Sequence, residues 1–416
     1  MSGFVPLFSH ETDEYVLASK APICVEYKVS TTENFDSIAD HGTAYTSSDI
    51  DFTIKVEAKD LTPYTRYCED APHVLLNSCV ESTNILIDYQ FNICNSNNTS
   101  PIGRTKTIPS KGDKVNDEVK IAVYSCSNYP FGFFNAFGNS ARKDSVDYVI
   151  HLGDYIYEYA NGEYGWGNSL GRIPLPDREI YTLYDYRKRL ATYRNDLDLR
   201  LSHQQFPWIP VWDDHEVADN TYRDGSAELN NTEDSFIKDG GVSVDQRKMN
   251  AVRAYFEWMP IRQVEMDDNL RIWRNFEIGD LMDLIMLDTR QYDRSITDLY
   301  WNTDYVHSIS NDAGRSLMGP RQESCKCSDA CSIIRSHLSN ADGTELQGST
   351  TASLSPQNEE QHGESSETKS SSLEWTCQEP KVLKTLSTTT HGMAIKAIAI
   401  AHLPHFTKTK LTTPFS

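Results

Sequence analysis

The chain has 416 residues and a formal net charge of −21, from 39 basic and 60 acidic side chains. Its aromatic content of 11% supports a sizeable core and excludes global disorder, and no run approaches the ~18–20 uninterrupted apolar residues of a membrane span. The acidic balance argues against nucleic acid as the main ligand, because binding a phosphate backbone requires a basic surface.

Residues 1–109 contain short segments with the alternation of β-strands. ICVEYKVST, DFTIKVEAKDL and IDYQFNICN alternate Val, Ile and Tyr with polar residues, which is typical of half-buried strands. Turn-forming residues in LTPYTRY and SNNTSPIGR fit antiparallel connections between them. We therefore predict an all-β sandwich, of immunoglobulin or fibronectin type, over residues 1–109.

Residues 69–88 interrupt this pattern. Removing the sequence EDAPHVLLNSCVESTNILID would join TPYTRYC to YQFNICN as one continuous Tyr-rich strand. We interpret the segment either as an insertion, such as a retained intron, or as a variable loop.

A polar linker, residues 110–118, leads into a region where strand and helix patterns alternate over residues 119–323. Five short segments predict strands: KIAVYSC, SVDYVIHL, WIPVW, RIWRNFEIG and MDLIMLD. Leu and Tyr at three- and four-residue spacing predict a helix across residues 181–203. A second helix is predicted over Gln246–Trp258, stopped by Pro260. Alternating strands and helices predict an α/β domain.

Residues 324–416 lose this alternation. They include a long Ser- and Thr-rich stretch with few aromatic residues, a composition that does not support a buried core. We predict a mostly disordered tail that adds no fold. The C-x-C-x₃-C spacing at Cys325, Cys327 and Cys331 is a weak signal for a soft metal.

Polar clusters stand directly after three of the predicted strands. They are Ser125–Asn128, Gly153–Tyr157 and Trp212–Glu216. Ligands collect at the carboxyl ends of strands in an open α/β sheet, so we expect the three clusters to meet there. Together they offer carboxylate, phenolate, thiolate and imidazole groups, a set that suits a two-metal hydrolase.

Each of these residues also has a structural interpretation. Asp154 could cap a helix, Cys126 could be a small buried side chain, and His215 could be an ion-pair partner. Taken singly, the structural interpretation is favoured each time. Three such clusters after successive strands are difficult to explain by capping and packing, and they favour the metal site.

Five motifs carry a resemblance to a known family. KIAVYSCSN, DYVIHLGDYIYEY, VWDDHEVADN, LIMLDTRQY and SLMGPRQE resemble, in this order, the motifs of PhoD-type alkaline phosphatases. These are metallophosphatase-fold enzymes that hydrolyse phosphate mono- and diesters. The resemblance covers residues 119–323, and the predicted β-sandwich is similar to the domain that precedes the catalytic domain in this family.

The resemblance implies a metal-dependent phosphoric ester hydrolase that uses metal-activated water. We expect a small-molecule phosphate mono- or diester as substrate, a monomer, no nucleic-acid-binding domain and no membrane span. Members of the family are typically exported, which weakly favours a secreted origin. The segment MSGFVPLFSHETDEY has neither the basic nor the apolar region of a signal peptide, so the location remains open.

The resemblance also implies roles for individual residues. Cys126 and Tyr157 would be ligands of ferric iron (Fe3+). Asp154 would bridge the iron to one or two calcium ions (Ca2+), and Asp214 would bind the second metal. His215 would stabilise the transition state or protonate the leaving oxygen.

Two departures from the family pattern bear on activity. Asn128 stands where the family commonly has a carboxylate, and its carbonyl could still coordinate a metal. The family's later Gly-Asp-x-His motif does not follow Glu323, and the remaining histidines stand in other contexts: His391, His402 and His405. Because of these two departures, the alternative function is a catalytically impaired or inactive remnant that acts only as a binding or structural protein.

Arg290 would support the site or the substrate, or it would form a purely structural ion pair.

Overall fold

The structure is a computed structural model. It describes residues 21–59, 61–63, 86–115, 118–230, 232–238, 241–263, 270–296, 299–310, 312, 314–323, 382–386 and 397–401. Residues 69–85 of the predicted insertion and most of the predicted tail lie outside these ranges.

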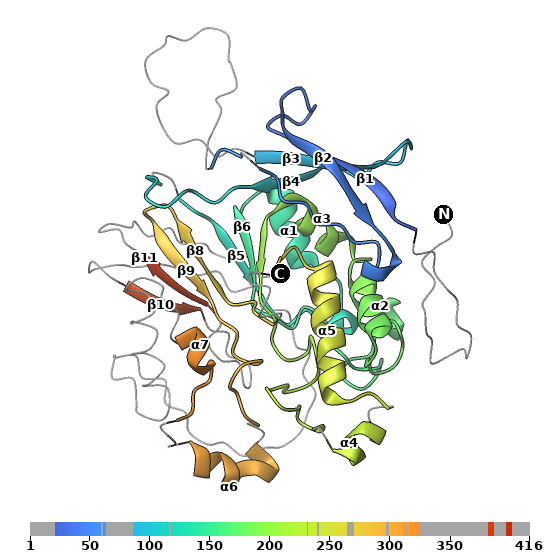
Figure 1. The fold of residues 1–416 in the computed structure, drawn as a ribbon, viewed down its shortest axis with the longest axis vertical. Helices are drawn as coiled ribbons and strands as arrows, with labels where there is room; N and C mark the ends of the chain where they lie inside the picture. Colours follow the sequence, from blue (N-terminus) through green and yellow to red (C-terminus); the bar gives the residue numbers. More distant parts are fainter. Residues whose placement is uncertain are drawn as a thin grey trace.

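The N-terminal part of the chain folds into one antiparallel sheet with the strand order β2-β1-β3-β4, drawn in blue at the top of Figure 1. Its strands are β1 (Ile23–Ser30), β2 (Ile38–Thr46), β3 (Leu86–Ile93) and β4 (Gly103–Lys106). The second sheet of a sandwich is not found among the described residues of this region, so the sandwich is not confirmed. Residues 86–88, which we assigned to the insertion, belong to β3 and pair with β4.

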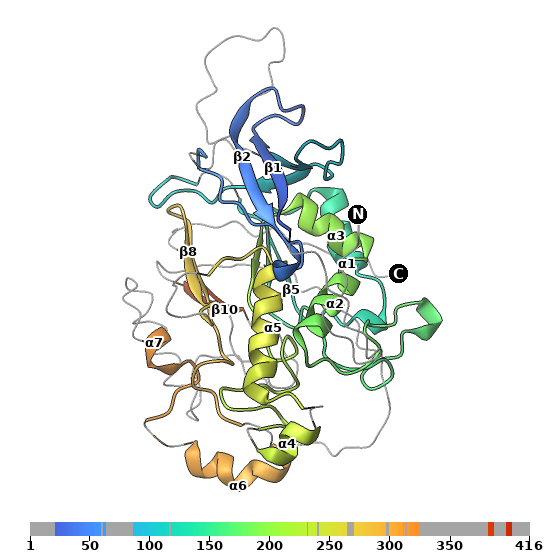
Figure 2. The same ribbon diagram turned by 45° about the vertical axis from the view of Figure 1, so that its right-hand side comes forward.

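The strand predicted over DFTIKVEAKDL is wrong. Residues 53–59 pair with none of the described strands and instead lie near helix α5 (Val244–Trp258), where the blue segment meets the yellow helix in Figure 2. Trp258 Nε1 donates a hydrogen bond to Asp51 Oδ2 at 2.9 Å, and Lys55 Nζ donates to the carbonyl oxygen of Ile261 at 2.6 Å. Polar contacts with the α/β unit therefore replace a β-ladder in this segment.

A disulfide joins Cys24 on β1 to Cys94 directly after β3, across 70 residues of sequence. We expect the Cys24→Ser/Cys94→Ser double variant to lose about 4 kcal/mol of unfolding free energy, because its unfolded chain is no longer cross-linked. Urea unfolding measures the change, and the wild type unfolded in a reducing agent is the matched control. Equal midpoints for the variant, the reduced wild type and the oxidised wild type would contradict the prediction.

A parallel sheet, with the strand order β5-β6-β7, forms the centre of the α/β unit. Its strands are β5 (Ile121–Tyr124), β6 (Tyr148–His151) and β7 (Trp208–Pro210). All three are short and lie within segments predicted as strands; β6 and β7 are buried throughout, and the first two residues of β5 are half-buried. The clusters that follow them in sequence therefore reach the same edge of one sheet.

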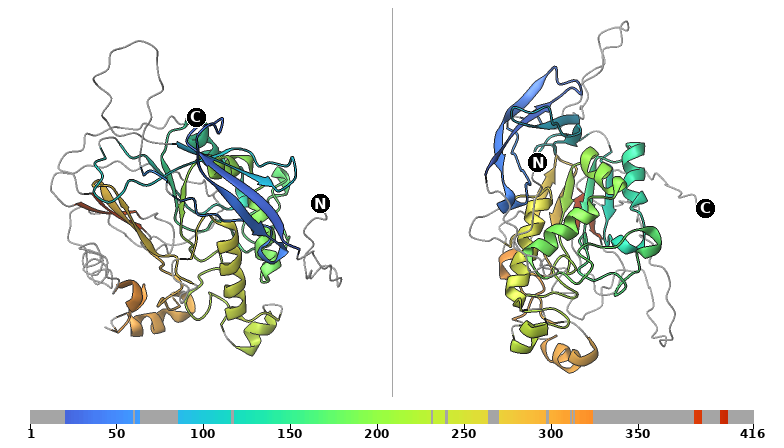
Figure 3. Two further views of the ribbon diagram at one scale, coloured as in Figure 1. Left: turned by 45° about the horizontal axis from the view of Figure 1, so that its top comes forward. Right: turned by 90° about the vertical axis from the view of Figure 1, so that its right-hand side faces the viewer.

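A second sheet is antiparallel and has the order β10-β11-β9-β8. Its strands are β8 (Arg274–Ile278), β9 (Met282–Met286), β10 (Val382–Leu386) and β11 (Ala397–Ala401). Leu284 and Met286 of β9 share one apolar core with Val149 and Ile209 of the parallel sheet. In Figures 1 and 3 this orange and red sheet lies on one side of the parallel sheet, with α5 on the other.

Strands β10 and β11 correct the prediction that residues 324–416 add no fold. β11 pairs along β9, with Ala399 opposite Leu284, and β10 pairs with β11. The apolar run AIAIA thereby covers an edge of β9 that would otherwise have exposed backbone groups. The C-x-C-x₃-C cysteines and the three late histidines lie outside the described residues.

The described helices besides α5 are α1 (Asn135–Lys143), α2 (Leu183–Tyr193), α3 (Leu197–Gln205), α4 (Glu233–Lys238), α6 (Leu299–Ile309) and α7 (Gly319–Glu323). Helices α1, α2, α3 and α5 share the apolar core of the parallel sheet. Helix α1 packs on α3, and α2 packs on α5. The helix predicted over residues 181–203 is two helices, because the Asp196 carboxylate accepts hydrogen bonds from the backbone N–H groups of Asp198 and Leu199 and starts α3 there. None of the described helices has the length and apolar character needed to cross a membrane.

Candidate functional site

The loops that follow β5, β6 and β7 meet at one edge of the parallel sheet. The Cys126 backbone N–H donates to the Gly153 carbonyl at 3.1 Å, and the Ser127 N–H donates to the Asp154 carbonyl at 2.8 Å. Gly153 has a φ of +103°, and a Cβ there would lie 2.2 Å from the backbone nitrogen of Asp213. Glycine is therefore required for the loops after β6 and β7 to approach this closely.

Two predicted ligands sit in unusual backbone conformations. Cys126 has a φ of +58° and Asp154 a φ of +55°. This left-handed region is uncommon for residues other than glycine, and such conformations are concentrated at functional sites. The Cys126 Sγ lies 3.3 Å from Asp154 Oδ2, so the two loops bring a thiol and a carboxylate into contact.

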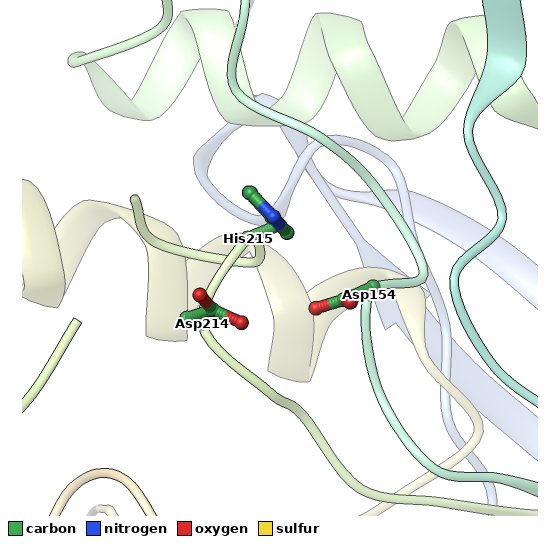
Figure 4. A group of neighbouring side chains, drawn as sticks. All are labelled: Asp154, Asp214 and His215. Atoms are coloured by element: carbon green, nitrogen blue, oxygen red, sulfur yellow. The ribbon is translucent and has the colours of Figure 1, made fainter. Parts of the chain in front are cut away.

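Asp154, Asp214 and His215 form a compact group of potential metal ligands. Each offers one ligand atom, and these atoms lie within 4.8 Å of one another. Figure 4 shows the carboxylates of Asp154 and Asp214 facing one another, with the His215 imidazole above them. Both carboxylates are buried, and two buried carboxylates this close repel each other. A cation between them would offset that repulsion, so the geometry can hold a metal ion.

Tyr157 lies against the same group. Burial raises the pKa of the Tyr157 phenol well above 10, and the neighbouring charges of Asp154 and Cys126 raise this pKa further. Its ring stacks on His215 with 4.3 Å between the ring centroids. The structure therefore brings four predicted site residues together around Asp154. They supply the Cys126 thiol, the Tyr157 phenol, the Asp214 carboxylate and the His215 imidazole.

Asn128 also belongs to this edge of the sheet. Its side-chain Nδ2 donates a hydrogen bond to the Tyr164 carbonyl at 3.1 Å. Its Oδ1 is buried and has no hydrogen-bond partner within the described part of the chain. A buried oxygen left without a partner costs about 1–3 kcal/mol, so this atom is suited to accept a ligand.

Glu158 orients His215. The His215 Nδ1 lies 2.8 Å from Glu158 Oε2, which leaves Nε2 as the ring nitrogen available for another group. Burial lowers the pKa of His215, but the carboxylates of Glu158, Asp214 and Asp154 outweigh burial and hold the pKa well above 6.5. Glu158 is part of the GDYIYEY motif, but the sequence alone did not assign it this role.

Arg290 contacts the carboxylates rather than solvent. It is 2% exposed, its Nε donates to Asp213 Oδ1 at 2.6 Å, and its Nη2 lies 3.2 Å from Asp214 Oδ1. Burial lowers the pKa of Arg290, but the two carboxylates more than offset this and raise it above its usual value. Both observed contacts are to the loop after β7, which makes Arg290 a positioning residue for Asp214.

The LDTRQY and SLMGPRQE motifs hold Arg290 in place. Asp288 Oδ2 accepts a hydrogen bond from Trp212 Nε1 at 2.9 Å, and its Oδ1 accepts from the backbone N–H groups of Arg290 and Gln291 at 2.9 and 3.0 Å. The Asp288 backbone is paired with the Gln322 side chain from α7. These motifs therefore act on the site indirectly, through the position of one guanidinium group.

Glu216, the last residue of the DDHE sequence, joins two of the loops. Its Oε1 accepts from the Tyr155 N–H at 2.6 Å, and its Oε2 accepts from the Asp213 N–H at 2.7 Å. It is 2% exposed. A single buried carboxylate therefore fixes the distance between the Asp154 loop and the Asp214 loop.

Helix α2 supplies two further positioning residues that the sequence reasoning missed. The Tyr193 hydroxyl accepts from the backbone N–H groups of Tyr129 and Tyr157, both at 3.2 Å. The buried Arg189 guanidinium donates to five carbonyls, those of Tyr157, Tyr159, Leu175, Pro176 and Arg178. The sequence did contain a signal for Arg189, because a charged side chain on the buried face of a predicted amphipathic helix requires buried partners.

A cavity of about 580 Å³ lies elsewhere, next to β4 and the loop before β6. Its walls include Lys106, which pairs with Asp147, but none of the predicted ligands. We place the candidate site at the strand ends rather than in this cavity, because the compact group of potential ligands found among the described residues lies at the strand ends.

An α/β fold that brings carboxylate, imidazole, thiol and phenol groups together at its strand ends is typical of metal-binding hydrolase folds. Comparisons with known proteins specify the family. The model of the PhoD-like phosphatases matches residues 121–325, and the model of their N-terminal domain matches residues 8–68. The chain belongs to the PhoD-like phosphatase family, as its motifs predicted.

Individual relatives agree with this assignment. Alkaline phosphatase D of Bacillus subtilis (strain 168) is 33% identical over 310 residues, which are 73% of this chain and 46% of that protein. A solved structure described as "Structure of PhoD" is 32% identical with a TM-score of 0.58, and the match covers 74% of this chain and 52% of that one. The chain thus spans about half the length of the curated relative it matches.

Proposed function

We propose that this chain is a metal-dependent hydrolase of phosphate mono- or diesters of small molecules. The observation that carries the proposal is the group of Asp154, Asp214 and His215, whose ligand atoms lie within 4.8 Å of one another and whose two carboxylates are buried. The Cys126 thiol and the Tyr157 phenol adjoin this group. Membership of a phosphatase family supports the same reaction class.

The donor set fits the two ions implied by the family resemblance. Cys126, Tyr157 and Asp154 would hold Fe3+, since thiolate and phenolate suit ferric iron, and Asp154 with Asp214 would hold Ca2+ through oxygen atoms. Asn128 Oδ1, which has no hydrogen-bond partner among the described residues, would be a further oxygen ligand. When bound, the ions supply positive charge that stabilises the charge developing on the phosphoryl oxygens.

The other residues are assigned by their contacts. His215, oriented by Glu158, would hydrogen-bond to the leaving oxygen or to the transition state through Nε2. Arg290 would keep Asp214 in place, and Glu216 would keep the two carboxylate loops at a fixed separation. These buried contacts would preorganise the site before substrate arrives.

Hydrolysis of p-nitrophenyl phosphate and bis-p-nitrophenyl phosphate tests the proposal. We expect p-nitrophenol release by protein loaded with Fe3+ and Ca2+, and a loss of at least about 100-fold after both ions are removed, because the substrate charge is then uncompensated. Metal content, measured by mass spectrometry on the same samples, should fall in parallel. Hydrolysis that persists in fully metal-free protein would contradict the metal requirement.

The second candidate is a non-catalytic remnant that acts only as a binding or structural protein. Asn128, at a position where the family commonly has a carboxylate, favours it. The same assay separates the two candidates. A remnant would take up metal but release no more p-nitrophenol than the buffer.

We also propose the organisation in which these parts act. Residues 1–109 form the N-terminal β domain, 110–118 the linker, 119–323 the phosphatase domain, and 324–416 a tail from which two strands return to the sheet of β9.

The disulfide of Cys24 and Cys94 supports an oxidising, exported location, because such bonds persist outside reducing compartments. We propose that the protein acts as a monomer on small phosphate esters.

A further inference from the structure

Four large aromatic side chains are exposed on the segments that follow β5 and β6. Phe131 and Phe133 follow β5, and Tyr164 and Trp166 follow β6; their exposed fractions are 42%, 59%, 48% and 64%. Exposed aromatic rings gathered at one place commonly mark a site that binds another molecule. The rings of Phe131 and Tyr164 are in contact, and we name these two residues the aromatic rim.

Tyr164 connects the aromatic rim to the candidate ligands. Its ring stacks on Tyr157 with 5.9 Å between centroids and on His215 with 6.5 Å, and the planes differ by 23° and 16°. Its backbone carbonyl accepts the hydrogen bond from Asn128 Nδ2. The ring is therefore placed directly beside the groups assigned to the phosphoryl centre, while about half of its surface remains open.

The loop that carries Tyr164 is held by its own hydrogen bonds. The Gly162 N–H donates to the Gly165 carbonyl at 2.8 Å, and the Gly167 N–H donates to Asn161 Oδ1 at 2.8 Å. The Phe131 ring meets the Tyr164 ring edge to face, with centroids 5.8 Å apart and planes at 87°. An aromatic surface fixed in this way binds a flat ring at a low entropic cost.

We propose that the aromatic rim is the subsite for the leaving group, and that it selects phosphate esters whose leaving group carries a planar aromatic or heteroaromatic ring. This inference rests on the proposed function, since a leaving group exists only if the site hydrolyses esters. His215 is the residue assigned to the leaving oxygen, and Tyr164 is stacked beside it. A ring joined to that oxygen by a short linker would reach Tyr164 and extend the existing stack.

Two substrates with the same leaving oxygen test the inference. Adenosine 5′-monophosphate and ribose 5-phosphate are both esters of a ribose 5′-oxygen, and only the first carries a flat ring. With metal-loaded wild-type protein, we expect kcat/KM to be roughly tenfold higher for the nucleotide, from stacking of one base on an aromatic side chain. In Tyr164→Leu, which keeps apolar bulk but removes the ring, we expect this ratio to fall towards one.

Matched variants complete the experiment. Tyr164→Phe should keep the wild-type ratio, and Tyr45→Leu, at an exposed tyrosine on β2, should change neither substrate. Thermal unfolding of each variant shows that the fold is intact. Failure of wild-type protein to hydrolyse these two esters and both p-nitrophenyl esters would overturn the proposed function. Hydrolysis of a p-nitrophenyl ester but of neither ribose ester would overturn the leaving-group inference. Hydrolysis of both at a ratio near one, or an equal loss of both in Tyr164→Leu, would overturn the leaving-group inference alone. A preference for long-chain alkyl phosphates would also overturn it, in favour of a lipid substrate.

Discussion

The Asp154→Asn variant is expected to lose on the order of 10³-fold or more in kcat/KM for p-nitrophenyl phosphate. The Asp154 carboxylate adjoins the Cys126 thiol on one side and the Asp214–His215 group on the other. Replacing its carboxylate by an amide removes the negative charge that would be shared between two ions. Asparagine is preferred to alanine because Asp154 has a φ of +55°, which asparagine tolerates.

The same substitution should not harm the fold. Removing one of two adjacent buried carboxylates relieves repulsion, so the metal-free variant should be at least as stable as metal-free wild type. Excess Fe3+ and Ca2+ should raise the melting temperature of the wild type and leave that of the variant nearly unchanged, because only the wild type binds the ions tightly. Thermal unfolding with and without metal measures both effects.

Asp144→Asn is the matched control for this variant. Asp144 also has a left-handed backbone, with a φ of +46°, but it lies exposed at the end of α1 and pairs with Arg104. We expect it to retain wild-type activity and wild-type metal stabilisation. An Asp154→Asn variant with the activity of Asp144→Asn would contradict the central role of Asp154.

Much of the α/β core could be predicted from the sequence, because its short strands are nearly continuous apolar runs. KIAVYSC, SVDYVIHL and WIPVW each contain an observed strand, and the polar residues after them lie at one edge, as parallel pairing requires. The side chains of Asp154, Asp214 and His215 were predicted together because each follows such a run directly. Local pattern and tertiary position agree at these residues.

The elements that were missed depend on contacts distant in sequence. DFTIKVEAKDL has the alternation of a strand, but it contacts α5 instead of a strand partner, while β2 carries a weaker pattern and does pair. The strand β11 lies in a segment separated from its partner β9 by about a hundred residues. No local pattern indicates which strand edge is available.

The same reasoning applies to the positioning residues of the site. Arg189 and Tyr193 follow the spacing of an ordinary amphipathic helix, yet their side chains hold the loop that presents Tyr157. Glu216 stands in the DDHE sequence, but its bond to the Tyr155 N–H joins two loops about 60 residues apart. Sequence motifs locate residues that bind ligands more easily than residues that hold them in position, because the second role depends on the folded path of the chain.

Arg290→Met should destabilise the protein by about 3–5 kcal/mol, the usual cost of breaking a buried ion pair from one side. The substitution leaves Asp213 and Asp214 buried without the guanidinium that contacts both at 2.6 and 3.2 Å. Metal affinity should fall by about 10- to 100-fold as well, since the orientation of Asp214 is no longer fixed. Urea unfolding of metal-free protein and metal titration measure the two effects separately.

Arg223→Met provides the control for this second variant, because Arg223 also pairs with two carboxylates, those of Asp224 and Asp293, but is half exposed. Exposed pairs contribute below about 1 kcal/mol, so Arg223→Met should unfold close to wild type. The comparison separates two roles for Arg290. If Arg290 bound substrate directly, Arg290→Met would raise KM and leave the unfolding free energy and the metal affinity unchanged. That result would contradict the positioning role. Loss of stability and metal affinity together is expected only if Arg290 acts through Asp213 and Asp214.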